Sequence, residues 1–542
     1  MLSVLGFLVA LMPLVVFHEF GHFIFARIFG VKAETFSVGF GKKLWRKQIG
    51  ETEWCLSAIP LGGYVKLLGE DGERQLTAEE QSRSLNRAAL WKRFFIFVGG
   101  PLFNFILSVF LFMAILLIGE PQMTSRLGRV VPGTAAARAG LQSGDRVVGI
   151  DGKPVRKFEE VLGAILENPG KQLALSVQRG AADSTPIDVR VQPTSQEGYS
   201  VYGEATHVGE LEGLLPMARS TTLGISDPAS LGAKAGLKTG DTVRSVGGKA
   251  VATWEEIEAA YSALNPGQSL SLVASGKDGE KSLEVKRFAG QSLAQASGIH
   301  SSEFFVDKPV EGSPAQAAGV LPGDRLIGVG THVVQSFIEL RDAVQRSGEQ
   351  HGKVSLVWER NGKVMQAEIV PTATNSRDPN LKKTTQFTVG VVPQLVWAEA
   401  ETLIERVYNP ITLVATATQR MWQHSERNLV SIVKMVKGEV SVKALGGPIL
   451  IGKVAGESLS RGLIAFLTTM SVLSVGLGVL NLLPVPVLDG GHIVLLGIEA
   501  ILRRPLSVRF VEVVQQVGFA LILLLMVVVM RNDISRLPIF GN

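Results

Sequence analysis

The chain contains 542 residues, enough for several domains, and 46% of them are hydrophobic. With 54 Lys and Arg against 49 Asp and Glu, its formal net charge at pH 7 is only +5. The chain has no basic stripe of the kind that binds nucleic acids, so we expect no nucleic-acid partner. The apolar residues cluster near the two ends, which excludes a uniformly soluble protein and predicts a membrane protein with a polar insert.

Four apolar runs have the length of membrane-spanning helices, which need about 20 residues. The runs cover residues 1–26, 94–118, 462–488 and 513–530, and Glu19 is the only charged residue in them. A cleaved signal peptide is the alternative for the first run, but this run has no basic beginning and no small-residue cleavage site. We therefore predict a multi-domain α-helical membrane protein with four transmembrane segments.

The distribution of basic residues predicts the orientation of these segments. Residues 27–93 contain twelve Lys and Arg, and Arg503, Arg504 and Arg509 lie between the third and fourth runs. By the positive-inside rule, both of these loops face the cytoplasm. The chain is then expected to cross the cytoplasmic membrane several times, in contact with its lipid. The insert and both termini lie on the opposite side, which is the periplasm if the cell is Gram-negative.

The first run contains HEFGH, an H-E-x-x-H motif, at residues 18–22. Residues i and i+4 share one face of a helix, so His18 and His22 can direct two ring nitrogens at one metal ion. Glu19 lies close enough to hold a water at that ion and to act as a general base. Zinc suits two imidazoles and an open coordination position. The alternative is a chance match in which both histidines only form hydrogen bonds between helices.

Residues 43–66 alternate strand-like side chains around the sequence GETE, which predicts a β-region between the first two membrane segments. A free edge of such a sheet could capture the backbone of an unwound substrate. The alternative is a cytoplasmic hairpin that only caps the helices.

Three similar segments in the insert indicate a repeated domain. They begin with ARAGLQSGD, AKAGLKTGD and AQAAGVLPGD, and the glycines of their Gly-Asp pairs are Gly144, Gly240 and Gly323. The spacings of 96 and 83 residues are the size of a domain. The pattern resembles circularly permuted bacterial PDZ domains, which are α+β folds that add a peptide or a C-terminus as an extra strand. Rigid spacers or a steric screen that binds nothing are the alternative.

The predicted domains follow from these segments and from the connector after them. The first membrane half covers 1–121, three PDZ domains cover 122–205, 206–300 and 301–394, an amphipathic connector covers 395–445, and the second membrane half covers 446–542. Within the connector, apolar residues at helical spacing are interspersed with Lys and Arg, as in helices that lie on a membrane surface. A plain connector helix packed on the bundle is the alternative, and His424 is expected to be solvated.

A second group of ionisable residues interrupts the third run, in NLLPVPVLDGGHIVLL. Two prolines and a Gly-Gly pair break the helix there, and broken backbone at membrane depth is tolerated only where it is buried in protein or lines a watery cavity. Asp489 and His492 are both able to supply a third metal ligand, and their spacing does not choose between them. A loop cap at the membrane surface is the alternative.

Several features together resemble the site-2 protease family of intramembrane metalloproteases, namely HEFGH, GPLFNF in the second run, NLLPVPVLDGGH and the PDZ repeats. The regulator of sigma-E protease branch is the most similar, because FSVGFGKKLW and LGGPI also match its β-region and its lead-in to the third segment. The resemblance covers essentially the whole chain. The branch usually has two PDZ domains, whereas this insert has three repeated segments.

The resemblance implies a role for each matching residue. His18, His22 and Asp489 would bind zinc, and Glu19 would be the catalytic base. The residues implied in substrate binding are Asn481, Pro484 and Pro486 of the third segment and Gly39, Phe40 and Gly41 of the Gly-x-Gly loop.

The implied activity is that of a zinc-dependent intramembrane endopeptidase, which cuts single-span membrane proteins after an earlier periplasmic cut has shortened them. An anti-sigma factor is the implied substrate, with signal-peptide remnants as a further one. The insert would exclude substrates with bulky periplasmic domains. The alternatives are a membrane-anchored PDZ adaptor with a non-catalytic metal site, and a site-2-type protease of another signalling pathway.

Overall fold

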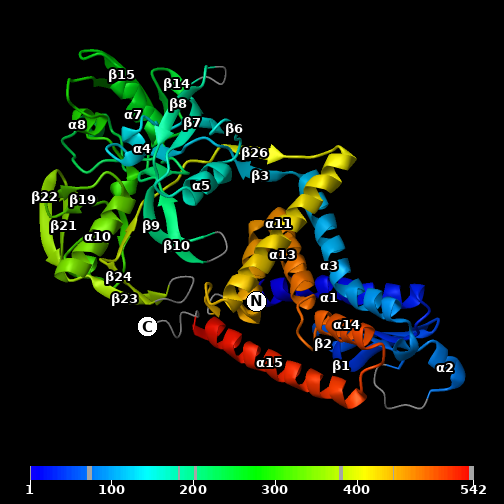
Figure 1. Cartoon of the computed structure of the whole chain (residues 1–542). Helices are drawn as coiled ribbons and strands as arrows, with labels where there is room; N and C mark the ends of the chain where they lie inside the picture. Colours follow the sequence, from blue (N-terminus) through cyan, green and yellow to red (C-terminus); the bar gives the residue numbers. More distant parts are fainter. Residues whose placement is uncertain are drawn as a thin grey trace. The chain divides into compact units, whose positions relative to one another are not determined.

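The structure, a computed structural model, describes residues 2–69, 76–180, 184–200, 204–377, 383–442 and 445–535. The chain forms two compact units (Figure 1). The helical unit is built mainly from Met1–Pro121 and Ile404–Gly541, and the insert unit from Gln122–Ser200 and Ala205–Leu403.

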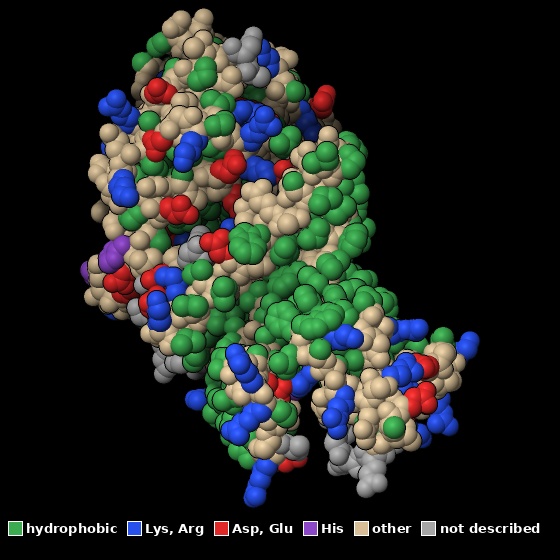
Figure 2. Space-filling view, turned by 45° about the vertical axis from the view of Figure 1, so that its right-hand side comes forward, with side chains coloured by type: hydrophobic (Ala, Val, Ile, Leu, Met, Phe, Trp, Pro, Cys, Tyr) green, Lys and Arg blue, Asp and Glu red, His purple; other side chains and the backbone are tan. Residues whose placement is uncertain are grey.

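Four helices of the helical unit are long and apolar enough to cross a membrane. They are α1 (Leu2–Ile28), α3 (Leu90–Ile118), α13 (Leu463–Asn481) and α15 (Val508–Ser535). Each helix coincides with one of the four predicted runs, although α13 ends at Asn481, before the two prolines that belong to the end of the third run. Figure 2 shows apolar side chains gathered over this unit, as expected for helices surrounded by lipid.

The helix that carries HEFGH packs directly against α3. A buried cluster joins it to three neighbouring helices: Ala10 and Leu14 of α1, Leu107 of α3, Ala455 of α12 (Pro448–Arg461), and Phe466 and Met470 of α13. Gly21 and Gly99 allow α1 and α3 to approach closely, because a Cβ on Gly21 would lie 2.1 Å from the carbonyl oxygen of Gly99.

The last two helices differ in how much of their surface is covered. α14 (Asp489–Leu502) follows the break after α13 and packs on α3. In α15, only 6% of the most apolar stretch is buried inside the protein. Gly518 of α15 lies against the ring of Pro486, and the Asp533 carboxylate accepts hydrogen bonds of 2.9–3.1 Å from three backbone N–H groups at the start of α12. These contacts hold α15 while most of its apolar surface stays exposed.

The predicted connector contains α11 (Pro410–Val436), a helix of 27 residues. One face packs on α3 and α13, where Leu413 and Phe112 share a buried cluster. His424 stacks on Phe112 with ring centroids 5.6 Å apart and is half-buried, so the prediction of a solvated histidine is wrong. The face with Trp422, which is 66% exposed, remains open. The helix is therefore packed on the bundle along one face and apolar on another.

The β-region consists of β1 (Ala33–Ile49) and β2 (Thr52–Leu67), so its strands extend beyond the alternating stretch at 43–66 and include the FSVGFGKKLW segment. Both strands bend. Residues 35–38 form the middle of the sheet, because they pair with 53–56 and also with 63–66. The stretch 63–66 is an outer strand, with no second partner strand among the described residues.

The insert unit contains three α+β modules, each with its own buried core. Each has a four-stranded sheet, in the orders β6-β5-β7-β8, β14-β13-β15-β16 and β20-β19-β21-β22. The strands are β5 (Arg146–Ile150), β6 (Lys153–Pro154), β7 (Leu173–Gln178), β8 (Ile187–Val191), β13 (Thr242–Val246), β14 (Lys249–Ala250), β15 (Ser269–Gly276), β16 (Gly279–Lys286), β19 (Arg325–Val329), β20 (His332–Val333), β21 (Val354–Arg360) and β22 (Lys363–Ile369). The longest helix of each module lies between its second and third strands: α5 (Phe158–Glu167), α7 (Trp254–Ser262) and α10 (Phe337–His351).

A short strand pair completes each module. The pairs are β4 (Arg129–Val130) with β11 (Leu214–Leu215), β12 (Leu223–Gly224) with β17 (His300–Ser301), and β18 (Val306–Pro309) with β25 (Val391–Pro393). Because β11 pairs with β4, the first module extends beyond residue 205.

The Gly-Asp pairs of the three repeats have the same local geometry. Gly144, Gly240 and Gly323 have φ of 84°, 97° and 86°, a left-handed conformation that favours glycine. Each following carboxylate accepts a hydrogen bond of 2.8–3.0 Å from the backbone N–H three residues before it. The basic side chains paired with these carboxylates are Arg179, Lys281 and Arg360. The Gly-Asp pair therefore recurs because each module needs this same turn.

A buried group of charged side chains joins the three modules, and we call it the inter-module ion cluster. Glu303 Oε1 lies 3.0 Å from Arg129 Nη1 and 3.2 Å from Arg219 Nη1. Arg219 also pairs with the buried Glu255 at 2.8 Å and, at the edge of the cluster, with Glu258 at 2.7 Å, whose side chain is 48% exposed. Both arginine side chains are at most 5% exposed. Charges buried to this extent require partners, so the modules depend on one another at this point.

Candidate active site

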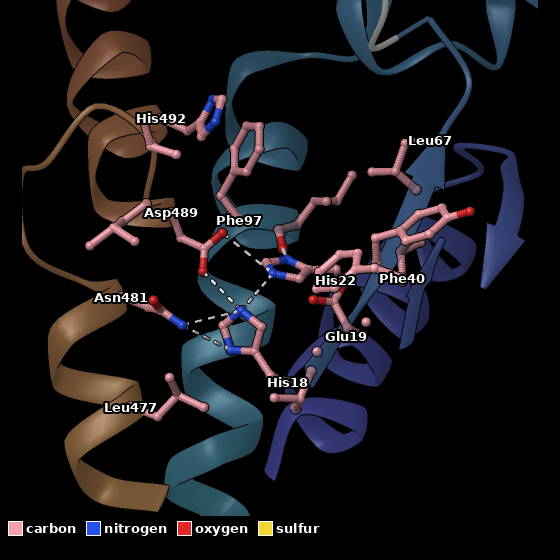
Figure 3. A pocket seen from close by; sticks show the side chains of 18 residues that line it. His18, Glu19, His22, Phe40, Leu67, Phe97, Leu477, Asn481, Asp489 and His492 are labelled. Carbon is pink, nitrogen blue, oxygen red and sulfur yellow. Dashed lines mark hydrogen bonds and ion pairs between the residues drawn. The ribbon is translucent and has the colours of Figure 1, made fainter. Parts of the chain in front are cut away.

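Three potential metal ligands converge in the helical unit. HEFGH lies on α1, where the spacing of four residues places His18 and His22 on one face. Their Nε2 atoms are 3.2 Å apart. The carboxylate of Asp489 lies 3.2 Å from His18 Nε2 and 3.4 Å from His22 Nε2 (Figure 3). The structure thus brings together residues from the two ends of the chain.

The spacing of these donor atoms fits zinc. Zinc bound tetrahedrally at about 2.0–2.1 Å has ligand atoms about 3.3–3.4 Å apart. The three measured separations are 3.2, 3.2 and 3.4 Å, and the side chains are only 10–15% exposed. In the described part of the chain, this is the one group of three His, Cys, Asp or Glu side chains placed to hold a metal ion. Three protein ligands leave a fourth position open, as catalytic zinc sites do.

The sequence after α13 explains why Asp489 reaches this position. Pro484 and Pro486 stop the helix, and α14 begins at Asp489. A Cβ on Gly490 or Gly491 would lie 2.2–2.3 Å from backbone oxygens of the break, so the two glycines let α14 start against it. The N-terminus of a helix also stabilises a carboxylate.

α3 supports both imidazoles from the opposite side. His22 Nδ1 lies 2.8 Å from the backbone oxygen of Ile96, and His18 Nδ1 lies 3.0 Å from the side-chain amide of Asn104. Gly100 lies against both rings, where a Cβ would be 2.3 Å from His22 Nε2 and 2.7 Å from His18 Cε1. Both Nδ1 atoms are therefore turned toward α3, and both Nε2 atoms toward the group of ligands.

The potential ligands line a cavity of about 420 Å³ together with Glu19. A Cβ on Gly63, in the outer strand of the sheet, would lie 3.3 Å from Glu19 Cγ. Tyr64 and Val65 of the same strand also line the cavity, as does Asn481 at the end of α13. A carboxylate, an amide and a sheet edge therefore meet the ligand group in one space within apolar helices.

Comparison with known proteins identifies the family of the chain. The sequence model of Peptidase family M50 matches residues 6–525. The chain belongs to peptidase family M50. A candidate zinc metalloprotease of Neisseria meningitidis is 31% identical over 540 residues, which cover 99% of both chains. The prediction that the chain is a member of the site-2 protease family is therefore confirmed.

Relatives of this M50 peptidase also include named regulators. The regulator of sigma-E protease of Salmonella typhimurium is 29% identical over 550 residues, covering 99% of this chain and 100% of the relative. The protease RseP of Yersinia pestis is 28% identical over 543 residues, or 99% of both chains. A solved PDZ-domain protein of Parabacteroides distasonis covers 51% of this chain and 99% of its own at 11% identity, but its TM-score of 0.12 is too low to inform the fold.

The structure distinguishes the two possible third ligands that the sequence left open in this M50 peptidase. Asp489 joins the two histidines. His492 also lines the cavity, but its ring stacks on Phe97 with centroids 4.6 Å apart and planes 11° from parallel. Figure 3 shows His492 beside Phe97 and Asp489 directed at the two imidazoles.

Two of the six residues implied in substrate binding, Asn481 and Phe40, line the cavity. The other four are absent from the described lining: Gly39, Gly41, Pro484 and Pro486. Gly39 and Gly41 have φ of 90° and 84°, so they shape the bend of β1 that presents Phe40. The prolines likewise end α13 directly after Asn481. These four residues shape the backbone beside the cavity, and their roles with substrate stay predictions.

Three residues of α3 that support the ligands were not among the predicted site residues. Ile96 acts through a backbone oxygen, which leaves no signal in a sequence. Gly100 and Asn104 belong to FVGGPLFNF, where a polar amide in an uncharged apolar run was the available signal. That signal pointed to the family but not to a contact with His18.

Proposed function

We propose that the chain is a zinc-dependent intramembrane endopeptidase that cleaves single-span membrane proteins. The observation that carries the proposal is the convergence of two imidazoles and a carboxylate at zinc spacing, with Glu19 in the same cavity. A relative named as a candidate zinc metalloprotease supports the choice of metal. The apolar helices that carry these residues support a reaction at membrane depth.

The residues divide the chemistry of peptide hydrolysis. Zinc held by His18, His22 and Asp489 would polarise the scissile carbonyl group and make a nearby water more acidic. Glu19 takes the proton of the attacking water on its carboxylate and passes it to the nitrogen of the leaving amine. His22 is held in orientation by the hydrogen bond that its Nδ1–H donates to the carbonyl oxygen of Ile96, which leaves Nε2 for the metal.

The outer strand of the sheet supports binding of an unwound substrate. A helical substrate hides its carbonyl groups in its own hydrogen bonds, so the cleaved segment must first become extended. The strand at 63–66 borders the cavity and has a single partner strand among the described residues, so its other edge can pair with that segment. The amide of Asn481, in the same cavity, would orient the extended backbone.

The cellular role is proposed from the relatives and from charge. A relative named as a regulator of sigma-E protease supports a role in the same regulation, with a shortened anti-sigma factor as substrate. We place the chain in the inner membrane with a periplasmic insert, because basic residues concentrate in the loop 27–93 and at 503–509. The three α+β modules would be PDZ domains that screen out bulky substrates and offer grooves for a peptide or a C-terminus.

The proposed base is tested with the purified full chain and a Glu19→Gln variant. The amide cannot take a proton from water, so cleavage of a single-span substrate should fall below detection while zinc content matches the wild type. Glu512→Gln makes the same change on the exposed surface of α15 and should keep both properties. Cleavage by zinc-loaded Glu19→Gln protein would contradict the base, and a wild type that binds no zinc would contradict the metal site.

The substrate is identified by comparing membrane proteomes of cells that carry the wild type or Glu19→Gln. A shortened single-span protein should accumulate only with the variant. Accumulation of full-length, untrimmed proteins instead would contradict the proposed need for an earlier cut.

A further inference from the structure

We infer that Asn104 is a positioning residue of the metal site, whose amide oxygen accepts a hydrogen bond from Nδ1–H of His18. This contact holds the imidazole in the tautomer that binds the metal through Nε2. The inference rests on the proposed zinc site and extends it to a residue of α3 that would not touch the metal or the substrate.

Asn104 is placed rigidly and is completely buried. It lies in the middle of α3 and is 0% exposed. Its side-chain amide is 3.0 Å from His18 Nδ1. Its backbone oxygen accepts a hydrogen bond of 2.8 Å from the hydroxyl of Ser474 on α13, which fixes this turn of α3 against its neighbour. An amide held in this way has little freedom except rotation of its own terminal group.

The amide oxygen of Asn104 is unsatisfied as it stands. Among the described residues, Oδ1 has no hydrogen-bond partner. Buried polar atoms without partners are rare because they lose their hydrogen bonds to water and gain nothing in return. Because Asn104 faces His18, a potential metal ligand, we expect a second state of the site in which its amide oxygen accepts a hydrogen bond.

Metal binding determines which end of the amide must face His18. A neutral imidazole carries one N–H, so coordination through Nε2 places the proton on Nδ1. The neighbour of Nδ1 must then be an acceptor, whereas the Asn104 nitrogen that now faces it is a donor. Rotation of the amide by 180° exchanges the two ends and brings Oδ1 to the Nδ1–H. The zinc-bound site therefore requires the rotated amide.

His22 shows the same arrangement with an acceptor that cannot be exchanged. Its Nδ1 lies 2.8 Å from the backbone oxygen of Ile96, about two helical turns before Asn104 on α3. A carbonyl oxygen can only accept, so His22 is fixed with its proton on Nδ1. Asn104 supplies for His18 what Ile96 supplies for His22.

Asn481 also lies near His18, but its geometry excludes the same role. Its Nδ2 is 3.4 Å from both ring nitrogens of His18. The N–H and lone-pair directions of an imidazole diverge in the ring plane, so an atom equidistant from both nitrogens lies along neither. Asn481 is therefore free to meet the substrate, while Asn104 orients the ligand.

The test measures zinc affinity of the purified full chain by competition with a chelator. Asn104→Leu keeps the size of the side chain but removes the acceptor, so zinc affinity should fall about 10–100-fold. Cleavage should recover as free zinc is raised. Asn104→Asp keeps an acceptor toward Nδ1–H and should bind zinc much more tightly than the leucine variant, a rescue that a packing role would not produce.

Two control variants separate this contact from its surroundings. Ser108→Ala changes a buried residue one turn further along α3, whose hydroxyl bonds to Phe105 of its own helix, and should leave zinc affinity unchanged. Asn481→Ala should also leave zinc affinity unchanged but lower cleavage. Melting temperatures of the zinc-free proteins show whether a variant has lost affinity because it has lost its fold.

Two results would overturn the inference. One is wild-type zinc affinity in Asn104→Leu. The other is an equal loss in Asn104→Leu and Asn104→Asp with unchanged melting temperatures, because the aspartate retains the acceptor. A wild type that binds no zinc would instead refute the proposed function, so the two failures are distinguishable.

Discussion

The metal site and the inter-module ion cluster both bury ionisable side chains, but they balance charge differently. In the cluster, two guanidinium groups face three carboxylates, with N···O separations of 2.7–3.2 Å for the close pairs. In the metal site, the carboxylate of Asp489 faces two imidazole nitrogens that each have a lone pair to offer when neutral. The cluster is complete without a ligand, whereas the metal site gathers electron-pair donors and requires a cation.

The buried charges of the cluster stabilise the fold, whereas the buried side chains of the metal site are arranged for a reaction. Replacing one member of the cluster leaves an oppositely charged side chain buried without its partner. Replacing Asp489 in the metal site removes a ligand together with the only carboxylate among the three ligands. Variants of the two sites should therefore fail in different ways.

The largest expected effect is on catalysis, in Asp489→Asn. The amide is a poor zinc ligand, so zinc content should drop and cleavage should fall at least about 1,000-fold, since the metal contributes several kcal/mol to the barrier. The free energy of unfolding of the zinc-free protein should change little. Asp307→Asn, an exposed change in the insert unit, is the matched control. Retained zinc and activity in Asp489→Asn would mean that another group in the cavity, such as His492, serves as the third ligand.

The next effect is on stability, in Glu303→Gln. This change leaves Arg129 and Arg219 with less negative charge around them, and breaking a buried pair in this way costs about 3–5 kcal/mol. The free energy of unfolding is measured in urea on the full chain through the fluorescence of the buried Trp254 and Trp358. Zinc content should match the wild type.

A surface ion pair provides the control for Glu303→Gln. Asp278 pairs with Lys238 at 2.8 Å, but both side chains are more than half exposed. Asp278→Asn should leave the urea midpoint unchanged, because solvent screens such pairs. Equal destabilisation by Asp278→Asn and Glu303→Gln would show that the buried cluster has no special role.

The smallest expected effect is the pH dependence of stability that His300 causes in the insert unit. Burial, together with the positive charge of Arg325, lowers the pKa of His300 to about 3. The unfolded chain binds this proton near pH 6.5, so the contribution to stability is complete above that pH and is lost as the pH falls toward 3. At pH 5 the loss is at most about 2 kcal/mol.

His300→Gln tests this pH dependence. The difference between urea midpoints at pH 7 and pH 5 should be smaller in the variant than in the wild type, because the glutamine does not titrate. An identical difference in the two proteins would show that His300 can be protonated in the folded state at no cost.

The ligands could be predicted from the sequence better than the groups that orient them. The spacing of His18 and His22 is a local property of one helix, so the motif alone predicted a shared face. Asp489 comes from the other end of the chain, and only the resemblance to a family favoured it over His492. Ile96 could not be predicted, because it acts through its backbone and the chain must fold before α3 lies beside α1.

The insert unit shows the same limit. Its repeats were visible because the Gly-Asp geometry is formed within a few residues around Gly144, Gly240 and Gly323. The inter-module ion cluster combines side chains from three modules, and no periodicity in the sequence relates them. His424 was wrongly expected in solvent because an amphipathic pattern shows that a helix has two faces but not which neighbour covers them.

The contact of Gly100 with both imidazoles limits how the protein can open. A single methyl group on Gly100 would push both imidazole rings away from Asp489. The distance between α1 and α3 therefore determines the geometry of the three metal ligands. The close contact between Gly21 of α1 and Gly99 of α3 fixes the same distance between the two helices. A gate for a substrate helix must therefore lie on another side of the bundle, because parting α1 from α3 would dismantle the site that the substrate has to reach.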